Sequence, residues 1–270
     1  MDYSPWIIVA KLADKGEYIA SESTFYKILK KEKQLAHRGK SRSPNKHRPL
    51  PLIAEGPNQI WSWDITYLKT LVRGQFYYLY LMMDVWSRRI VGFEIKEEES
   101  MEHSSTLMDK LCDNEGIKKD QLTLHSDNGG PMKGAMMLAT LERLGVAASF
   151  SRPRVSNDNP YSESLFKTLK YCPKYPERFE GLTKANQWMM LFVNWYNNHP
   201  HGGIKFVTPM ERHLELDKEI LKRRDIVYQK AKKEKPERRN NRKTRNWDKE
   251  EKVYFNYLQK EREIDIRKTS

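Results

Sequence analysis

The sequence lacks several features that would assign it to a common class of protein. No apolar run approaches the roughly 18 residues that a membrane span needs, so we expect no segment that crosses a bilayer. The opening MDYSPWIIVAKLADKG has no basic start followed by a long apolar stretch, and no secretory signal is expected. The only cysteines, Cys112 and Cys172, lie far apart without a Cys-x-x-Cys pair, which argues against a zinc or disulfide scaffold and fits a reducing cytoplasm.

Positive charge is the feature that the sequence has in excess. The formal net charge is +13, which is typical of a protein with a polyanionic partner. Residues 37–48 carry five Lys or Arg and two His with no acid, and residues 222–249 carry thirteen Lys or Arg against four acids. Such runs are typical of solvated arms that bind nucleic acid through its phosphates, although a merely solvated surface has the same composition.

The first residues predict a pair of short helices, over 5–15 and 21–33, separated by Gly16. Helix, short turn and helix is the helix-turn-helix pattern, which any small helical hairpin also shows. The expected buried side chains are Ile7, Ile8, Leu12, Phe25, Ile28 and Leu29. The second helix would turn toward DNA the side chains of Ser23, Thr24, Lys27 and Lys31.

The middle of the chain predicts a mixed α/β sheet. WSWDITYL alternates, with Ser62, Asp64 and Thr66 on one side, and FYYLYLMMD is apolar on both sides, as a covered central strand is. RIVGFEI follows after the turn DVWSR as an antiparallel partner. Helices and strands then alternate: helix 101–115, strand 122–126, helix 132–144, strand 146–150, and helices 161–171 and 183–198.

Four segments follow from these patterns. They are a helix-turn-helix segment over 1–35, a basic proline-rich linker over 36–57, the α/β core over 58–215, and a basic C-terminal tail over 216–270. In the last core helix we interpret one stripe as core rather than as a binding surface: Trp188, Leu191, Phe192 and Trp195.

Three acids in the core have the placement that a metal site needs. Asp64 lies within a strand on its polar side, Asp127 ends a later strand in LTLHSDNGGPMKG, and Glu163 lies in the first turn of a helix, with 35 residues between it and Asp127. On that helix Glu163, Lys167 and Lys170 share one side, opposite an apolar stripe. Each feature has an ordinary alternative, because Asp-Asn-Gly starts turns and Glu–Lys pairs stabilise helices.

Other polar residues are better explained by structure than by chemistry. Asp84 begins the turn between two strands, where Asp is common. His125 is a lone histidine near a strand end and is expected in the core or beside the acids. His199 and His201 flank Pro200 after a helix, so we expect a cap and a turn.

Six motifs give the sequence a close resemblance to a known family. The motifs are SESTFYKILK, WSWDITYL, DVWSRRIVGFEI, LHSDNGGPMKGAMMLATLERLGV, SFSRPRVSNDNPYSESLFKTLKY and FVNWYNNHPHGGIKFVTPMERH. They resemble bacterial insertion-sequence transposases of the Asp-Asp-Glu type, namely the catalytic subunit from the second of two overlapping frames, in the retroviral integrase superfamily. The resemblance implies an RNase H-like integrase catalytic core with five strands ordered 3-2-1-4-5.

The resemblance also implies the site and its chemistry. Asp64, Asp127 and Glu163 would be the catalytic acids and the ligands of two Mg²⁺ or Mn²⁺ ions, since hard oxygen ligands suit those metals. Lys167 and Lys170 would contact the DNA backbone. The reaction would be cleavage at element ends and joining of the 3′-OH to target DNA. Consistently, the sequence contains no Gly-x-x-x-x-Gly-Lys-Ser/Thr nucleotide loop.

The resemblance implies partners as well. These are the terminal inverted repeats and the target DNA, a second copy of the chain on DNA, and an upstream-frame protein, at the bacterial nucleoid. Two alternatives stay open at this stage: an RNase H-like nuclease that acts on RNA–DNA hybrids, and a DNA-binding regulator whose acids are structural.

Overall fold

The computed structural model describes residues 4–34, 52–127, 129, 133–151, 159–234, 236 and 243–255. The chain divides into two compact units, Met1–Lys46 and His47–Ser270. Each unit is described by itself. In the described ranges, no helix combines the length and the apolar character that crossing a membrane requires.

The first unit contains the two predicted helices, α1 (Pro5–Asp14) and α2 (Glu22–Lys31). Ser21 precedes α2 as predicted, but its Oγ lies 2.9 Å from Ser23 Oγ instead of capping the helix. The prediction of buried stripes is wrong for Ile7, which is 45% exposed, and for Ile28, which is 53% exposed. Two ten-residue helices are too small to enclose a core of their own.

The second unit is built on a five-stranded sheet in the order β4-β3-β2-β5-β6. Its strands are β2 (Ile60–Lys69), β3 (Phe76–Asp84), β4 (Ile90–Lys96), β5 (Thr123–Ser126) and β6 (Ala147–Phe150). The first three strands in the chain pair antiparallel, whereas β5 is parallel to both β2 and β6. This is the predicted 3-2-1-4-5 order, and the RNase H-like fold is confirmed.

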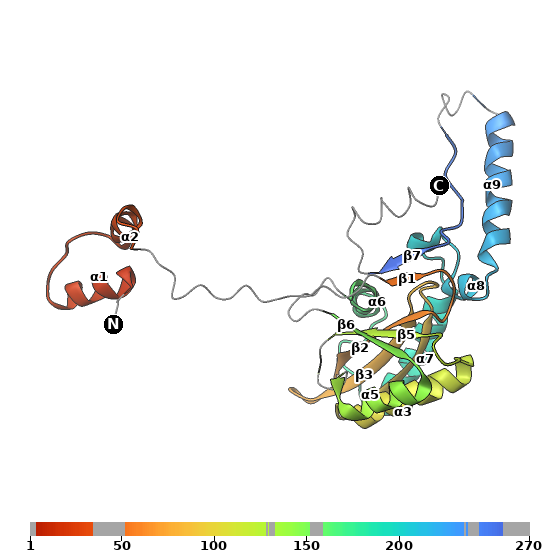
Figure 1. Cartoon of the computed structure of the whole chain (residues 1–270), viewed down its shortest axis with the longest axis horizontal. Helices are drawn as coiled ribbons and strands as arrows, with labels where there is room; N and C mark the ends of the chain where they lie inside the picture. The colour runs from red at the N-terminus through yellow and green to blue at the C-terminus, as the bar shows by residue number, and fades with distance from the viewer. Residues whose placement is uncertain are drawn as a thin grey trace. The chain divides into compact units, whose positions relative to one another are not determined.

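Helices cover both faces of this sheet (Figure 1). On one face lie α3 (Met101–Glu115) and α5 (Ala135–Leu144), which enclose a core that includes Trp61 and Trp63 of β2. On the other lie α6 (Pro160–Lys170) and α7 (Leu182–Asn198), over Ile60 and Leu68 of the same strand. The polar side of β2, which carries Asp64, therefore faces α6 instead of open solvent.

The predicted buried stripe of α7 is wrong in its rotation about the helix axis. Leu191 is 71% exposed and Trp195 is 44% exposed, whereas Phe192 is buried as predicted. The side chains that pack inward are Ala185, Met189, Phe192 and Tyr196. Both stripes have helical spacing and share Phe192, so periodicity alone does not distinguish them.

Parts of the predicted linker and tail are folded onto the second unit. Strand β1 (Leu52–Ala54) lies within 36–57 and pairs antiparallel with β7 (Val253–Phe255) from the C-terminal segment. After η2 (Gly202–Ile204) come α8 (Pro209–His213) and α9 (Asp217–Glu234). Within the predicted tail, residues 217–234 thus form a helix and 253–255 a strand.

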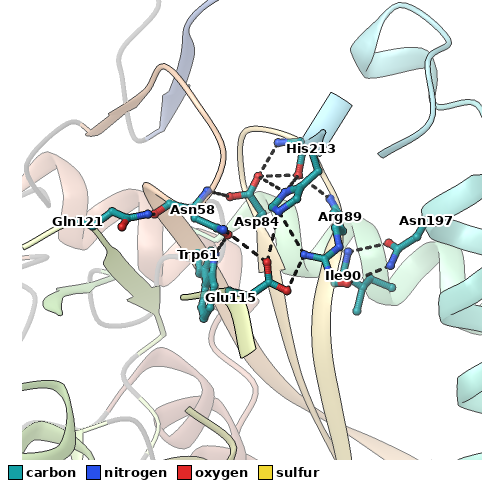
Figure 2. Close-up of polar contacts among 10 residues, drawn as sticks. Asn58, Trp61, Asp84, Arg89, Ile90, Glu115, Gln121, Asn197 and His213 are labelled. Carbon is teal, nitrogen blue, oxygen red and sulfur yellow. Dashed lines mark hydrogen bonds and ion pairs between the residues drawn. The ribbon is translucent and has the colours of Figure 1, made fainter. Parts of the chain in front are cut away.

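A buried polar network holds the turn between β3 and β4 (Figure 2). Asp84 accepts hydrogen bonds at Oδ1 from the N–H (2.7 Å) and the Oγ (2.6 Å) of Ser87, and at Oδ2 from the N–H of Asn58 (2.8 Å). Asp84 therefore begins a turn, as predicted. Asn197 of α7 fastens the next strand by exchanging two hydrogen bonds with the backbone of Ile90.

Charge balance stabilises this network. Arg89 Nη1 lies 2.8 Å from Glu115 Oε1, and His213 Nε2 lies 3.4 Å from Glu115 Oε2. The hydrogen bond from His213, with that from Arg89, lowers the pKa of Glu115 to about 2 against the effect of burial. Burial disfavours charged His213, but the carboxylates of Asp84 and Glu115 outweigh it and raise the pKa of His213. Two acids and two bases thus join α3, α8 and the β3–β4 turn.

We expect Glu115→Gln to lower Tm at pH 7 by about 5 °C, because it leaves Arg89 and His213 buried without their shared carboxylate. Since the pKa of Glu115 is lowered on folding, its stabilisation is complete above pH 4.5 and is lost as pH falls toward 2. The difference in Tm between the variant and the wild type should therefore decrease as pH falls over that range, which thermal melts measure. Asp109→Asn, which breaks an exposed pair with Arg143, is the control and should cost less than about 1 kcal/mol.

Candidate active site

The parallel pairing of β2 and β5 brings two of the predicted acids to one end of the sheet. Ser62 is in register with His125. Two residues further along each strand are Asp64 and Asp127, and because side chains alternate, they lie on the same face as that pair. The structure therefore places Asp64 and Asp127 side by side at the end of neighbouring strands.

A buried hydroxyl attaches the third acid to β2. Ser62 Oγ donates to Asn159 Oδ1 at 2.5 Å and lies 2.6 Å from Ser162 Oγ. Asn159 Nδ2 donates to the carbonyl of Trp63 at 3.3 Å. Ser62, Asn159 and Ser162 are all at least 96% buried, and Glu163 follows Ser162 in α6. The start of α6 is thus bound directly to the strand that carries Asp64.

Sequence reasoning missed these three positioning side chains. The helix predicted over 161–171 leaves Asn159 outside it, where Asn before Pro is typical of a turn. In the structure Asn159 occupies the N-cap position but makes no side-chain cap bond. Its amide bonds to β2 instead. The available signal was Ser62 itself, a small polar residue on the same side of β2 as Asp64.

The electrostatic environment of Asp64 includes the charges of the other two acids. Burial raises the pKa of Asp64 to about 7, and the negative charges of Asp127 and Glu163 add to the rise. The N–H of Ile65 and the charge of Lys170 act in the opposite direction. Burial and Lys69 in turn lower the pKa of Lys170, partly offset by Asp64. At Asp64, the effect of each neighbouring acid is therefore larger than the opposing effect of Lys170.

The donor set fits a hard divalent cation. Asp64 Oδ1 accepts from the N–H of Ile65 and Asp127 Oδ1 from that of Gly129, both at 2.8 Å, so local backbone orients each carboxylate. Asp64, Asp127 and Glu163 are each partly exposed. Oxygen-only ligands suit Mg²⁺ or Mn²⁺. Across the described residues, however, no three His, Cys, Asp or Glu side chains lie close enough together to hold a metal ion.

The histidines have the structural positions that were expected. His125 is fully buried, with Nδ1 2.9 Å from Ser149 Oγ and Nε2 3.2 Å from Ser151 Oγ. His199 ends α7, and His201 Nδ1 accepts from the N–H of Gly203. His125 is thus a core residue close to the acids.

The predicted DNA-contacting side chains are all exposed. Lys167 and Lys170 project from α6 on the side away from its buried residues, beside Glu163. The helix α2 exposes its own set in the first unit: Ser23, Thr24, Lys27 and Lys31. Two surfaces, one in each unit, therefore have groups suited to phosphates, and their contacts with DNA stay predictions.

Comparison with known families identifies the core. Two family models, both described as "Integrase core domain", match residues 54–156 and 144–209 and together include all three acids. Among curated proteins, the chain is 30% identical over 167 residues to the transposase for insertion sequence element IS904 of Lactococcus lactis, covering 58% of this chain and 62% of that protein. Residues 54–209 therefore form an integrase core domain, and the chain is similar to insertion-sequence transposases.

A second relative covers less of the chain. Transposase InsF for insertion sequence IS3A of Escherichia coli is 31% identical over 126 residues, which is 47% of this chain and 43% of that protein. This chain therefore spans less than two thirds of the length of either relative.

Solved structures show a similar but distant arrangement. A chain of the simian T-cell lymphotropic virus intasome in complex with PP2A regulatory subunit B56 gamma has a TM-score of 0.47 and 19% identity, covering 76% of this chain and 70% of its own. The catalytic core domain of BIV integrase has a TM-score of 0.45 and 20% identity, covering 59% and 96%. The fold assignment therefore rests on the strand order described above.

We expect Asp64→Asn to raise Tm of the metal-free integrase core at pH 8 by about 2–4 °C. A pKa raised to about 7 means that the ionised Asp64 lowers stability progressively between pH 4 and 7, and the amide removes that charge. With Mn²⁺ the wild type should instead have the higher Tm of the two proteins, because the ion stabilises only the chain that can bind it. Glu180→Gln, an exposed acid outside the site, is the control. A wild type without a Mn²⁺ shift would contradict the metal assignment.

Proposed function

We propose that the chain is a DNA transposase that cleaves the ends of its element and joins the resulting 3′-OH to target DNA. The observation that supports the proposal is an integrase core in which the charges of Asp127 and Glu163 both raise the pKa of Asp64. Both reactions exchange or hydrolyse a phosphodiester and need the same groups.

The three acids would hold two Mg²⁺ or Mn²⁺ ions. When bound, such ions activate the attacking oxygen and stabilise the leaving oxygen of an in-line displacement at phosphorus. The chain's own contribution is position and charge. The β2–β5 pairing sets Asp64 beside Asp127, and Ser62 holds the start of α6, which carries Glu163. Because ligation requires an ionised carboxylate, metal affinity should weaken as pH falls below 7.

The lysines of α6 would orient the DNA. Lys167 and Lys170 are exposed on the same helix as Glu163, four and seven residues later, so they flank the position of the reacting phosphate. Lys170 is close enough to affect the pKa of Asp64. Its charge would then be shared between the acids and a phosphate oxygen, which lies near them during reaction.

The partners follow from the reaction. Joining two element ends to a target requires at least two copies of the chain on DNA, and the terminal inverted repeats would be recognised through α2 and an upstream-frame protein. The transposase would act at the bacterial nucleoid. An RNase H-like nuclease is the second candidate, because it has the same fold and acids, and a DNA-binding regulator is the third.

A joining assay separates these candidates. With labelled element ends and Mn²⁺, the wild type should join strands, and Asp64→Asn and Glu163→Gln should reduce joining at least about 1000-fold while DNA binding is retained. Glu180→Gln should join normally. Cleavage of an RNA–DNA hybrid without joining would favour the nuclease, and equal activity of Asp64→Asn and wild type would falsify the catalytic assignment.

DNA binding by α2 is tested separately. Replacing Lys27 and Lys31 by Ala should weaken binding to element ends and reduce the slope of log K against log salt by about 2, since each lysine would neutralise one phosphate. Fluorescence anisotropy at several salt concentrations measures this. Lys15→Ala, an exposed lysine at the end of α1, should change affinity less than about twofold. An equal loss in both proteins would indicate general charge attraction instead of docking by α2.

A further inference from the structure

The C-terminal segment returns to the active-site end of the second unit. The integrase core models end at residue 209, whereas β7 (Val253–Phe255) pairs with β1, which precedes the core strands. Leu52 is in register with Phe255, and Ala54 with Val253. A segment that the family match does not include is therefore part of the structure around the site.

Several polar contacts anchor this segment. Trp86 Nε1 donates to the carbonyl of Glu251 at 3.1 Å, and Arg212 Nη2 donates to that of Glu250 at 2.9 Å. The Nζ of Lys252 lies 3.0 Å from the carboxylate of Glu55. These bonds come from the β3–β4 turn, from α8 and from the chain before β2. Because they act on backbone as well as side chains, they fix the path of the segment toward Phe255.

Phe255 packs between two elements that carry acids. Its side chain is fully buried. The ring lies edge-on to His125 of β5, with centroids 4.5 Å apart, and stacks on Tyr161 of α6 at 5.2 Å with an interplanar angle of 25°. Aromatic pairs of this kind contribute about 0.5–1.5 kcal/mol each beyond the area that they bury. One ring thus joins the end of β5 to the start of α6.

Both contacts lie two residues before an acid. His125 precedes Asp127 along β5, so the two side chains share one face of the strand. Tyr161 precedes Glu163 in the first turn of α6, where two residues correspond to about 200° of rotation. Tyr161 therefore packs inward on Phe255 while Glu163 points out of the core. The thickness of the Phe255 ring sets the spacing between these two backbones.

The ring completes a set of three connections. The pairing of β2 with β5 positions Asp64 beside Asp127. The hydrogen bond of Ser62 with Ser162 connects the strand of Asp64 to the helix of Glu163. Phe255 relates Asp127 to Glu163, through His125 and Tyr161. We propose that Phe255 is a positioning residue, which holds the end of β5 and the start of α6 at the spacing that the acids need. The catalytic consequence of this inference rests on the proposed function.

Hydrogen exchange tests the positioning itself, without metal or DNA. In Phe255→Ala, the backbone amides of residues 124–126 and 163–165 should exchange at least about tenfold faster, with little change in β3 and β4. Phe179→Ala is the matched control, because Phe179 is equally buried in the same core but its ring contacts Tyr175 and Trp188. Phe255→Leu refills most of the volume and serves if the alanine variant does not fold.

The joining assay tests the consequence. Phe255→Ala should reduce kcat about 10- to 100-fold with KM for the DNA end unchanged, as misplacement of catalytic groups does, and Phe255→Leu should recover most of the loss. Phe179→Ala should keep kcat within about threefold at the same fraction folded. The inference is overturned if exchange near the acids is not selectively faster, or if Phe179→Ala lowers kcat equally. A wild type that joins no DNA would instead contradict the proposed function, and the exchange result would still decide the positioning.

Discussion

Repulsion among carboxylates is the constraint on which this structure depends. Burial, together with the charges of Asp127 and Glu163, raises the pKa of Asp64 to about 7, so the ionised carboxylate lowers the stability of the fold. Other contacts in the fold must therefore supply the stabilising free energy. It does so with buried contacts placed one or two residues from each acid, where the environment is apolar and the hydrogen bonds are protected. Ser62 is the clearest case, since its hydroxyl binds two side chains of α6 at short range.

A second cluster of charged side chains lies at the turn between β3 and β4. The turn between β3 and β4 is held by Asp84, Arg89, Glu115 and His213, where charges are balanced instead of accumulated. Trp86 in the same turn bonds the C-terminal segment. The β3–β4 turn thus carries a charge-balanced network that stabilises the fold, whereas Asp64, Asp127 and Glu163 supply negative charge that a cation can neutralise. Asp84 is fully buried and serves the structure, whereas Asp64, Asp127 and Glu163 are partly exposed.

Much of the core could be predicted from the sequence, for physical reasons that differ between elements. The alternation in β2 and the apolar pattern of β3 identify strands because each face has a different environment. The stripe on α6 predicts which side carries Glu163, because that helix has one apolar face. Strand order came from the family resemblance. In α7, by contrast, aromatic residues occupy two overlapping stripes, and the inward one is decided by packing on the sheet.

The connections between elements could not be predicted in this way. The side chain of Asn159 bonds a strand 97 residues earlier in the chain, instead of its own helix, and no local pattern records that choice. Strand β7 has three residues, too few for periodicity to register. The basic character of residues 222–249 indicated a solvated arm, yet α9 contacts the core through hydrogen bonds from Arg224 to the carbonyls of Lys205 and Phe206. The segment before β7 in turn contacts α9 through the ion pair of Lys249 with Asp217.

The pairing of β1 with β7 has a consequence for biosynthesis. A polypeptide leaves the ribosome from its N-terminus, and the five core strands are all translated by residue 150. The Phe255 ring is translated only after about a hundred further residues. A nascent or prematurely terminated chain can therefore build the sheet but not the contact of Phe255 with His125 and Tyr161.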